Sequence, residues 1–329
     1  MKGLLTWLRR WGISVASFVG GLLTLFVFRH ELDHLPWVIG YVLLLVLLFA
    51  VVAQVRGALE ASTRRAHRLV ITAADYTLQT LYHGVLLFLL PPYWASTTLG
   101  SPNALFLLLL AALALLATFD PWYRALVHPR PWLGAVYFAV SVFGALNVAL
   151  PLVGVRPHLA LLVGAWTAVV GLTPAVQRAR RWRWRTSLAV MALAGVGAAA
   201  LAHAARAWIP PAPLSLARAV IAWDVVGLDP VEPVRGPVRA AALHARGLVA
   251  YTAVFAPAGL TQPIRHVWRH EGRPVTVVEL APVRGGRREG FRTYSRKTAF
   301  PADPTGRWCV DVVTASGQLI GRLTFRVVA

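Results

Sequence analysis

The chain contains little cysteine, little lysine and little charge of either sign. A single cysteine, Cys309, excludes both an intrachain disulfide and a cysteine-rich metal site. Charged residues make up 14% of the 329 residues, against about 25% in soluble domains, and hydrophobic residues make up 57%. So few polar side chains cannot cover a globular surface, which excludes a wholly soluble protein. The high apolar content also excludes a disordered chain.

Acidic residues are scarce as well, with 13 Asp and Glu against 33 Lys and Arg, which gives a net charge of +20. In a soluble protein this excess would indicate nucleic-acid binding. In a membrane protein it first indicates orientation. Residues 1–214 carry 17 basic and 5 acidic residues, and residues 215–329 carry the other 16 and 8. The two parts therefore need separate explanations.

Long apolar runs divide the first part of the chain. A helix that crosses a bilayer needs about 20 mostly apolar residues, and seven segments meet this condition: 11–29, 36–55, 69–90, 103–119, 131–150, 158–176 and 187–209. The first is interpreted as an uncleaved helix, because no small-residue cleavage site follows it. The last has no lysine for a Schiff base, which excludes retinal chemistry. The sequence therefore predicts a membrane all-α bundle of seven transmembrane helices over residues 1–209.

The basic residues of this part gather on one side of the predicted bundle. The N-terminus and the loops at 56–68, 120–130 and 177–186 hold fourteen of them, and the opposite side holds three. The positive-inside rule then puts the N-terminus in the cytoplasm and residues 210–329 on the far side of the membrane. Tryptophans near most predicted helix ends agree, because indoles favour the interface.

The apolar pattern changes after Pro210-Pro211-Ala212-Pro213, so residues 210–214 are predicted to form a stiff linker. Short runs rich in Val, Phe, Tyr and Thr predict strands at 248–256, 264–270, 274–281, 290–296, 307–315 and 318–328. Gly272-Arg273 and Ser316-Gly317 are predicted hairpin turns. Six or more short strands predict an all-β, Ig-like sandwich over residues 215–329.

Four blocks in this domain carry a family resemblance: His266-Val267-Trp268-Arg269-His270, residues 290–297, Gly306-Arg307-Trp308 and residues 317–322. In this order they resemble a bacterial domain of unknown function, number 2914. Leu89-Leu90-Pro91-Pro92-Tyr93 and Asp120-Pro121-Trp122-Tyr123 look like the multi-pass part that accompanies this domain in some proteobacterial proteins. The resemblance implies a protein of the bacterial inner membrane with a periplasmic β-domain. It implies no reaction, substrate or catalytic residue.

One zinc motif occurs in the chain, at His30-Glu31-Leu32-Asp33-His34. On a helix, His30 and His34 would share a face and Glu31 would activate a water molecule. However, Pro36 disfavours helix at the preceding residue, and no third ligand lies in a recognisable motif on the same side. An interfacial turn is the preferred interpretation, and a zinc-dependent membrane metallohydrolase is the alternative.

The third predicted span contains a polar stripe, because Asp75, Gln79 and His83 are spaced four residues apart. An ionisable group inside a span costs about 2.5–3.5 kcal/mol and faces the bundle interior or a water-filled path. A proton or ion relay and a cofactor site both fit the stripe. Plain interhelical hydrogen bonding, with Asn147 as a candidate partner, fits it as well.

Cations alternate with indoles before the last predicted span, at Arg181, Trp182, Arg183, Trp184 and Arg185. Each arginine near an anionic surface contributes about 1 kcal/mol, and tryptophan favours the interface. Because these residues already account for the topology, the run is predicted to be a lipid-interface anchor. Nucleic-acid binding is not expected.

A second basic set lies in the β-domain: Arg284, Arg287, Arg288, Arg292, Tyr294, Arg296 and Lys297. If 288–296 is a strand, Arg288, Arg292, Tyr294 and Arg296 lie on one face and Phe291 on the other. Arginine forks there would suit the phosphates or carboxylates of a lipid, a glycan or an acidic partner. A solvated strand face paired with Glu289, Glu279 and Asp303 is the alternative.

The sequence has no nucleophile elbow, Walker loop, dinucleotide fingerprint or haem motif. We therefore expect a non-enzymatic membrane protein without a cofactor, which binds an envelope component or serves as an accessory subunit. A transporter or channel based on Asp75, Gln79 and His83 is the alternative.

Overall fold

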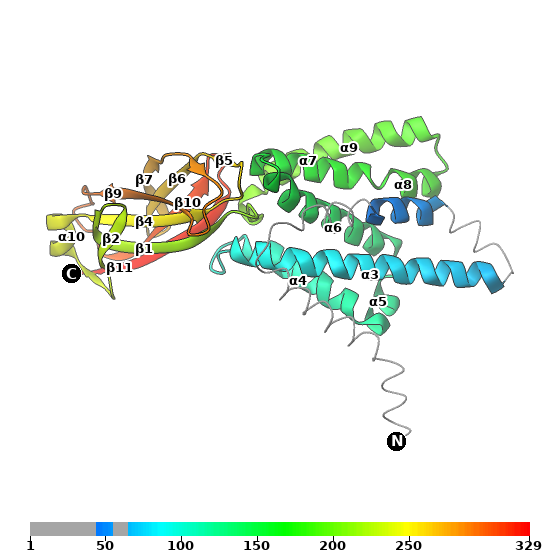
Figure 1. Cartoon of the computed structure of the whole chain (residues 1–329), viewed down its shortest axis with the longest axis horizontal. Coiled ribbons are helices and arrows are strands. Elements are labelled where there is room, and N and C mark those ends of the chain that lie inside the picture. The colour runs from blue at the N-terminus through cyan, green and yellow to red at the C-terminus, as the bar shows by residue number, and fades with distance from the viewer. Residues whose placement is uncertain (1–43, 55–64) are drawn as a thin grey trace, which may run out of the picture. The chain divides into compact units, whose positions relative to one another are not determined.

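The computed structural model describes residues 44–54 and 65–329 (Figure 1). The chain divides into two compact units. The first comprises Met1–Pro91, Leu107–Ala149 and Leu159–Ala204, and the second comprises Pro92–Phe106, Leu150–His158 and Ala205–Ala329. The second unit is thus assembled from three separate stretches of the chain.

The described part of the first unit is helical. After a short apolar helix at Leu44–Gln54, the helices are α3 (Arg65–Ala95), α4 (Ala104–Thr118), α5 (Asp120–Leu126), α6 (Pro131–Leu152), α7 (Pro157–Val170), α8 (Thr173–Arg180) and α9 (Trp184–Ala204). Pro121 prevents α4 from continuing, because its nitrogen carries no hydrogen and cannot donate to a carbonyl of the preceding turn. It stands instead in the first turn of α5, a position that proline favours.

Three described helices are long and apolar enough to cross a membrane, namely Pro131–Leu152, Pro157–Arg180 and Trp184–Ala204. They become four if α4 and α5, which are bent by 106°, form one broken span. Seven spans were predicted, five of them within residues 65–329. The predicted segment 69–90 lies in α3, which carries the polar stripe and is not among the three. The predicted first span lies outside the described residues, and of the second only residues 44–54 are described, as a short apolar helix.

The C-terminal part of the second unit contains two main sheets. The four-stranded sheet has the order β2-β1-β4-β9 and the five-stranded sheet the order β3-β11-β10-β6-β7, while β5 and β8 form a separate pair. The strands are β1 (Ser215–Val226), β2 (Asp229–Pro233), β3 (Val238–Arg239), β4 (Leu248–Phe255), β5 (Thr261–Gln262), β6 (Ile264–His270), β7 (Arg273–Glu279), β8 (Val283–Arg284), β9 (Phe291–Lys297), β10 (Gly306–Thr314) and β11 (Leu319–Val328). A short helix, α10 (Ala240–Arg246), precedes β4.

One hydrophobic core joins side chains from both main sheets. Trp268 of β6 and Trp308 of β10 are its largest members, and Leu248 and Val254 come from β4 of the other sheet. All six predicted strands are present within one or two residues of their expected ends. The first hairpin turn is Glu271-Gly272, one residue earlier than predicted. Both residues have positive φ, 47° and 78°, as a two-residue type I′ turn requires.

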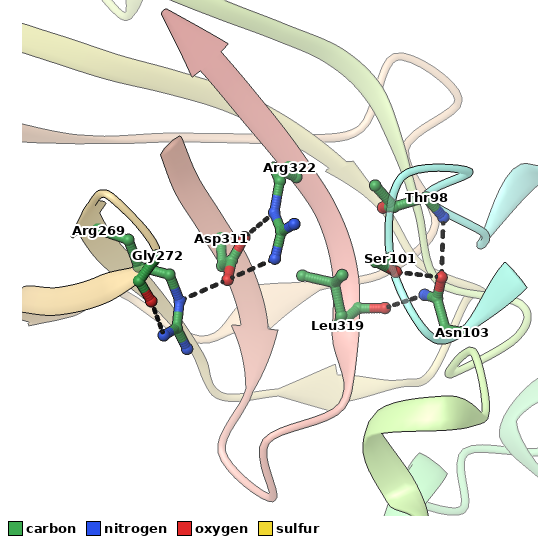
Figure 2. A network of polar contacts seen from close by, with 8 residues as sticks. All are labelled: Thr98, Ser101, Asn103, Arg269, Gly272, Asp311, Leu319 and Arg322. Atoms are coloured by element: carbon green, nitrogen blue, oxygen red, sulfur yellow. Dashed lines mark hydrogen bonds and ion pairs between the residues drawn. The ribbon is translucent and has the colours of Figure 1, made fainter. Parts of the chain in front are cut away.

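The predicted linker at 210–214 is packed into the second unit, where Ala212 and Leu214 are fully buried. The stretch Pro92–Phe106 is held in the same unit by Asn103 (Figure 2). The buried Asn103 amide donates to the Leu319 carbonyl at 3.3 Å, and its Oδ1 accepts from Ser101 Oγ at 2.6 Å. A segment between two helices is therefore tied to the start of β11.

Candidate functional site

Strand β9 presents alternate residues to its two faces. Arg292, Tyr294 and Arg296 are exposed, as the predicted alternation requires. Lys297 falls on the opposite, buried face, where its Nζ donates to Thr276 Oγ1 at 2.6 Å. Burial lowers the pKa of Lys297. Its assignment to the outer basic surface was wrong, because an odd residue cannot share a strand face with its even neighbours.

The exposed arginines of β9 are neutralised by aspartates on other strands. Arg296 pairs with Asp224, and Arg292 lies 3.4 Å from Asp229. A backbone hydrogen bond from Val225 and the Arg296 guanidinium together lower the pKa of Asp224. The alternative interpretation of the sequence paired these arginines with Glu289, Glu279 and Asp303 instead. Because β9, β4 and β1 are neighbours in one sheet, acids of the β1–β2 hairpin take that place.

Three arginines of the predicted set keep their charge uncompensated. Arg284, Arg287 and Arg288 are exposed, and none of them makes an ion pair within the part of the chain that the structure describes. Arg287 lies over the Phe291 ring, 5.8 Å from its centroid. Arg288 precedes β9, which begins only at Phe291, so it is a loop residue and not a strand residue.

The polar stripe of α3 meets the break between α4 and α5. Gln79 Nε2 donates to the Ala117 carbonyl at 3.0 Å and to Asp120 Oδ1 at 2.7 Å. The last carbonyls of a helix have no partner within it, and Gln79 satisfies one of them at the end of α4. Within α4 itself, Thr118 Oγ1 donates to the Ala114 carbonyl at 2.8 Å. Gln79 therefore serves an interhelical hydrogen bond.

His83 lies beside a cavity of about 10 Å³, which is room for about one water molecule. The His83 side chain is buried, and its Nε2 has no hydrogen-bond partner among the described residues. The cavity lining includes Gln79 and Asp120 but not Asp75, which is half-buried. The stripe thus supplies two of its three predicted members to one polar site. Asp120, which lies 41 positions from Gln79 in the sequence, joins them.

The predicted lipid anchor runs from the residue after α8 into the first turn of α9. Trp182 and Trp184 are exposed, as are Arg181, Arg183 and Arg185. The zinc motif at His30, Glu31 and His34 lies outside the described residues. Within residues 44–54 and 65–329, no group of three or more His, Cys, Asp or Glu side chains could hold a metal ion.

A buried carboxylate between two arginines was not predicted. Asp311 of β10 accepts from Arg269 Nε at 2.8 Å and pairs with Arg322 through both carboxylate oxygens (Figure 2). Its side chain is 4% exposed. Asp311 interrupts an apolar run between Val310 and Val312, and this charge at an outward strand position was the available signal.

A second buried network surrounds His266 in the core between the sheets. Its Nδ1 lies 2.8 Å from Ser295 Oγ and its Nε2 lies 3.0 Å from Thr252 Oγ1. Trp268 Nε1 also donates to Ser295 Oγ, at 3.0 Å. Burial lowers the pKa of His266 to about 4. This arrangement keeps the imidazole neutral and fully hydrogen-bonded.

The fold thus combines helices long and apolar enough to cross a membrane with a C-terminal β-domain. Two families of unknown function match the chain: DUF5924 over residues 2–250 and DUF2914 over residues 261–327. The chain belongs to the first family and carries the second at its C-terminus. No curated protein and no solved structure matches it. The first match ends within β4, so the four-stranded sheet combines strands from both matches.

Proposed function

We propose that this chain is a non-enzymatic protein of the bacterial inner membrane with seven transmembrane helices. Its C-terminal domain is an Ig-like sandwich in the periplasm, and this domain binds an anionic envelope component or docks onto a membrane complex. One observation carries the proposal, namely the exposed and uncompensated charge of Arg284, Arg287 and Arg288. Basic residues outnumber acidic residues in this domain, and the membrane topology does not require this excess.

Loss of these charges is expected to release the bound component. In full-length protein purified in mild detergent at low salt, the double variant Arg287→Gln/Arg288→Gln should retain at least about tenfold less of it, because each such charge contributes about 1 kcal/mol. Mass spectrometry identifies and quantifies the retained lipids and proteins. The matched variant Arg292→Gln/Arg296→Gln should lose less, because aspartates already neutralise those arginines. Retention that survives high salt would contradict an electrostatic contact.

The make-up of the second unit supports the proposed topology. Two of its three stretches, Pro92–Phe106 and Leu150–His158, are the segments that the charge pattern assigns to the same side as residues 210–329. The hydrogen bond from Asn103 to the Leu319 carbonyl supports a topology in which this stretch and β11 share one side of the membrane. Loops of opposite sidedness cannot meet in this way.

Cysteine accessibility tests the topology. In a Cys309→Ser background, Ala258→Cys in the β-domain should react with a membrane-impermeant maleimide once the outer membrane is opened. Ala179→Cys in α8 should react only after the inner membrane is disrupted. Both positions are exposed in their own units, so burial does not distort the comparison. The opposite labelling pattern would reverse the proposed orientation.

A further inference from the structure

The outer face of the five-stranded sheet is rich in arginine. Its strands alternate between core and outward residues, and the outward positions of β6, β10 and β11 include Arg265, Arg269, Arg307, Arg322 and Arg326. Arg265 is paired with Glu279 at 2.7 Å. Of the other four, Arg269 and Arg322 contact the buried carboxylate of Asp311. This face is distinct from the β9 face and from the loop at 284–288.

Two of these arginines oppose each other without compensation. Arg307 of β10 is the direct register partner of Arg326 of β11, and both are exposed. Neither makes an ion pair with any acid in the described part of the chain. The Glu271 carboxylate accepts the backbone N–H of Arg307 at 2.6 Å. Like charges directly opposite on a sheet destabilise it, so a bound anion would relieve this pair.

The other two arginines are held in fixed positions. Asp311 accepts from both guanidinium groups, and Arg269 Nη1 also donates to the Gly272 carbonyl at 3.1 Å (Figure 2). One carboxylate cannot neutralise two guanidinium groups, so one positive charge remains. Cys309 and Thr324 are register partners between this pair and the opposed pair on the same face. The surface is therefore both charged and partly preorganised.

We propose that this face binds phosphoryl groups, with Arg307 and Arg326 as the primary ligand-binding pair and Arg269 and Arg322 beside them. Two opposed arginine forks offer more N–H donors than one carboxylate accepts, whereas the several oxygens of a phosphoryl group accept from both forks. The inference goes beyond the proposed function, because it adds a second binding face, separate from the loop that carries Arg284, Arg287 and Arg288. A lipid headgroup and a soluble phosphate supply the same chemistry.

Binding is tested with full-length protein in neutral detergent. The probes are pyrophosphate in solution and phosphatidic acid in mixed micelles, with diacylglycerol micelles as the control without phosphate. The shift in thermal unfolding measures binding as each probe is titrated. The variant Arg307→Gln/Arg326→Gln should weaken binding at least about 30-fold, because two charge-assisted contacts are lost. Response to phosphatidic acid alone identifies a headgroup, and response to pyrophosphate identifies a soluble ligand.

A second readout separates binding from a structural role. Without any probe, the single variant Arg326→Gln should unfold about 2 °C higher than wild type, because the opposed like charges are removed. Arg292→Gln/Arg296→Gln removes the same charge from the other main sheet, where aspartates already neutralise these arginines, and should leave phosphate binding within about twofold. Equal loss in both double variants, or no binding of either probe by wild type, overturns the inference. If only Arg287→Gln/Arg288→Gln loses its ligand, the proposed function stands without this face.

Discussion

Replacing Asp311 by alanine is expected to destabilise the β-domain by about 3 kcal/mol. Removing one partner of a buried ion pair costs about 3–5 kcal/mol because the remaining charge is left uncompensated. Here two guanidinium groups lose their counter-charge, but each keeps about three-tenths of its side chain exposed and is partly rehydrated. This places the expected loss at the lower end of the range. Denaturant unfolding of the full-length protein, followed by tryptophan fluorescence, measures it.

The exposed pair of Asp224 and Arg296 provides the matched control. It joins the same residue types on the outer face of the other sheet, where both side chains are about half exposed. Asp224→Ala should therefore cost much less stability than Asp311→Ala, because solvent screens an exposed pair. Asp311→Asn, which keeps an acceptor oxygen but no charge, should fall between the two alanine variants. Equal costs for Asp311→Ala and Asp224→Ala would mean that Asp311 is not a buried counter-ion.

Local sequence patterns predicted the strands of the β-domain well, because alternation and turn residues act over a few positions. The run Val275-Thr276-Val277-Val278 and the Gly272 turn identify β7 within two residues. No strand was predicted at residues 215–226, where β1 lies, because its arginine and aspartate residues interrupt an apolar segment. Because the burial of β1 changes along its twelve residues, its apolar and polar residues do not alternate as regularly as those of the shorter strands.

Ionic partners could not be predicted, because they depend on strand order. Arg296 pairs with Asp224, 72 positions earlier, since β9 and β1 flank β4 in one sheet. The predicted acids were chosen because they are near β9 in the sequence, but Glu279, for example, pairs with Arg265 of another strand. The same holds for the polar stripe. Its spacing identified a shared helix face, while the partner Asp120 depends on how α3 packs against the α4–α5 break.

Acid is expected to destabilise the β-domain through His266 between about pH 6.5 and pH 4. The pKa of His266 is lowered from 6.5 to about 4, so the unfolded chain binds a proton in this window and the folded chain does not. Stability therefore rises with pH across the window and is fully present above it. A shift of this size corresponds to about 3 kcal/mol lost by pH 4, at about 1.4 kcal/mol for each pH unit.

The cause is burial without a compensating charge. The hydrogen-bonding groups that face His266 are the hydroxyls of Thr252 from β4 and Ser295 from β9, and both are neutral. An imidazolium would keep its hydrogen bonds but lose its hydration, which is the larger cost.

Unfolding of the full-length protein at a series of pH values measures the slope. His266→Gln should remove most of it, at some cost in stability at pH 7. The exposed His244→Gln serves as the control and should leave the slope in place. The aspartates whose pKa values are lowered become protonated only below pH 4. The stability lost on their protonation therefore lies below the pH window of His266 and cannot be mistaken for it. An unchanged slope in His266→Gln would show that another group causes the acid sensitivity.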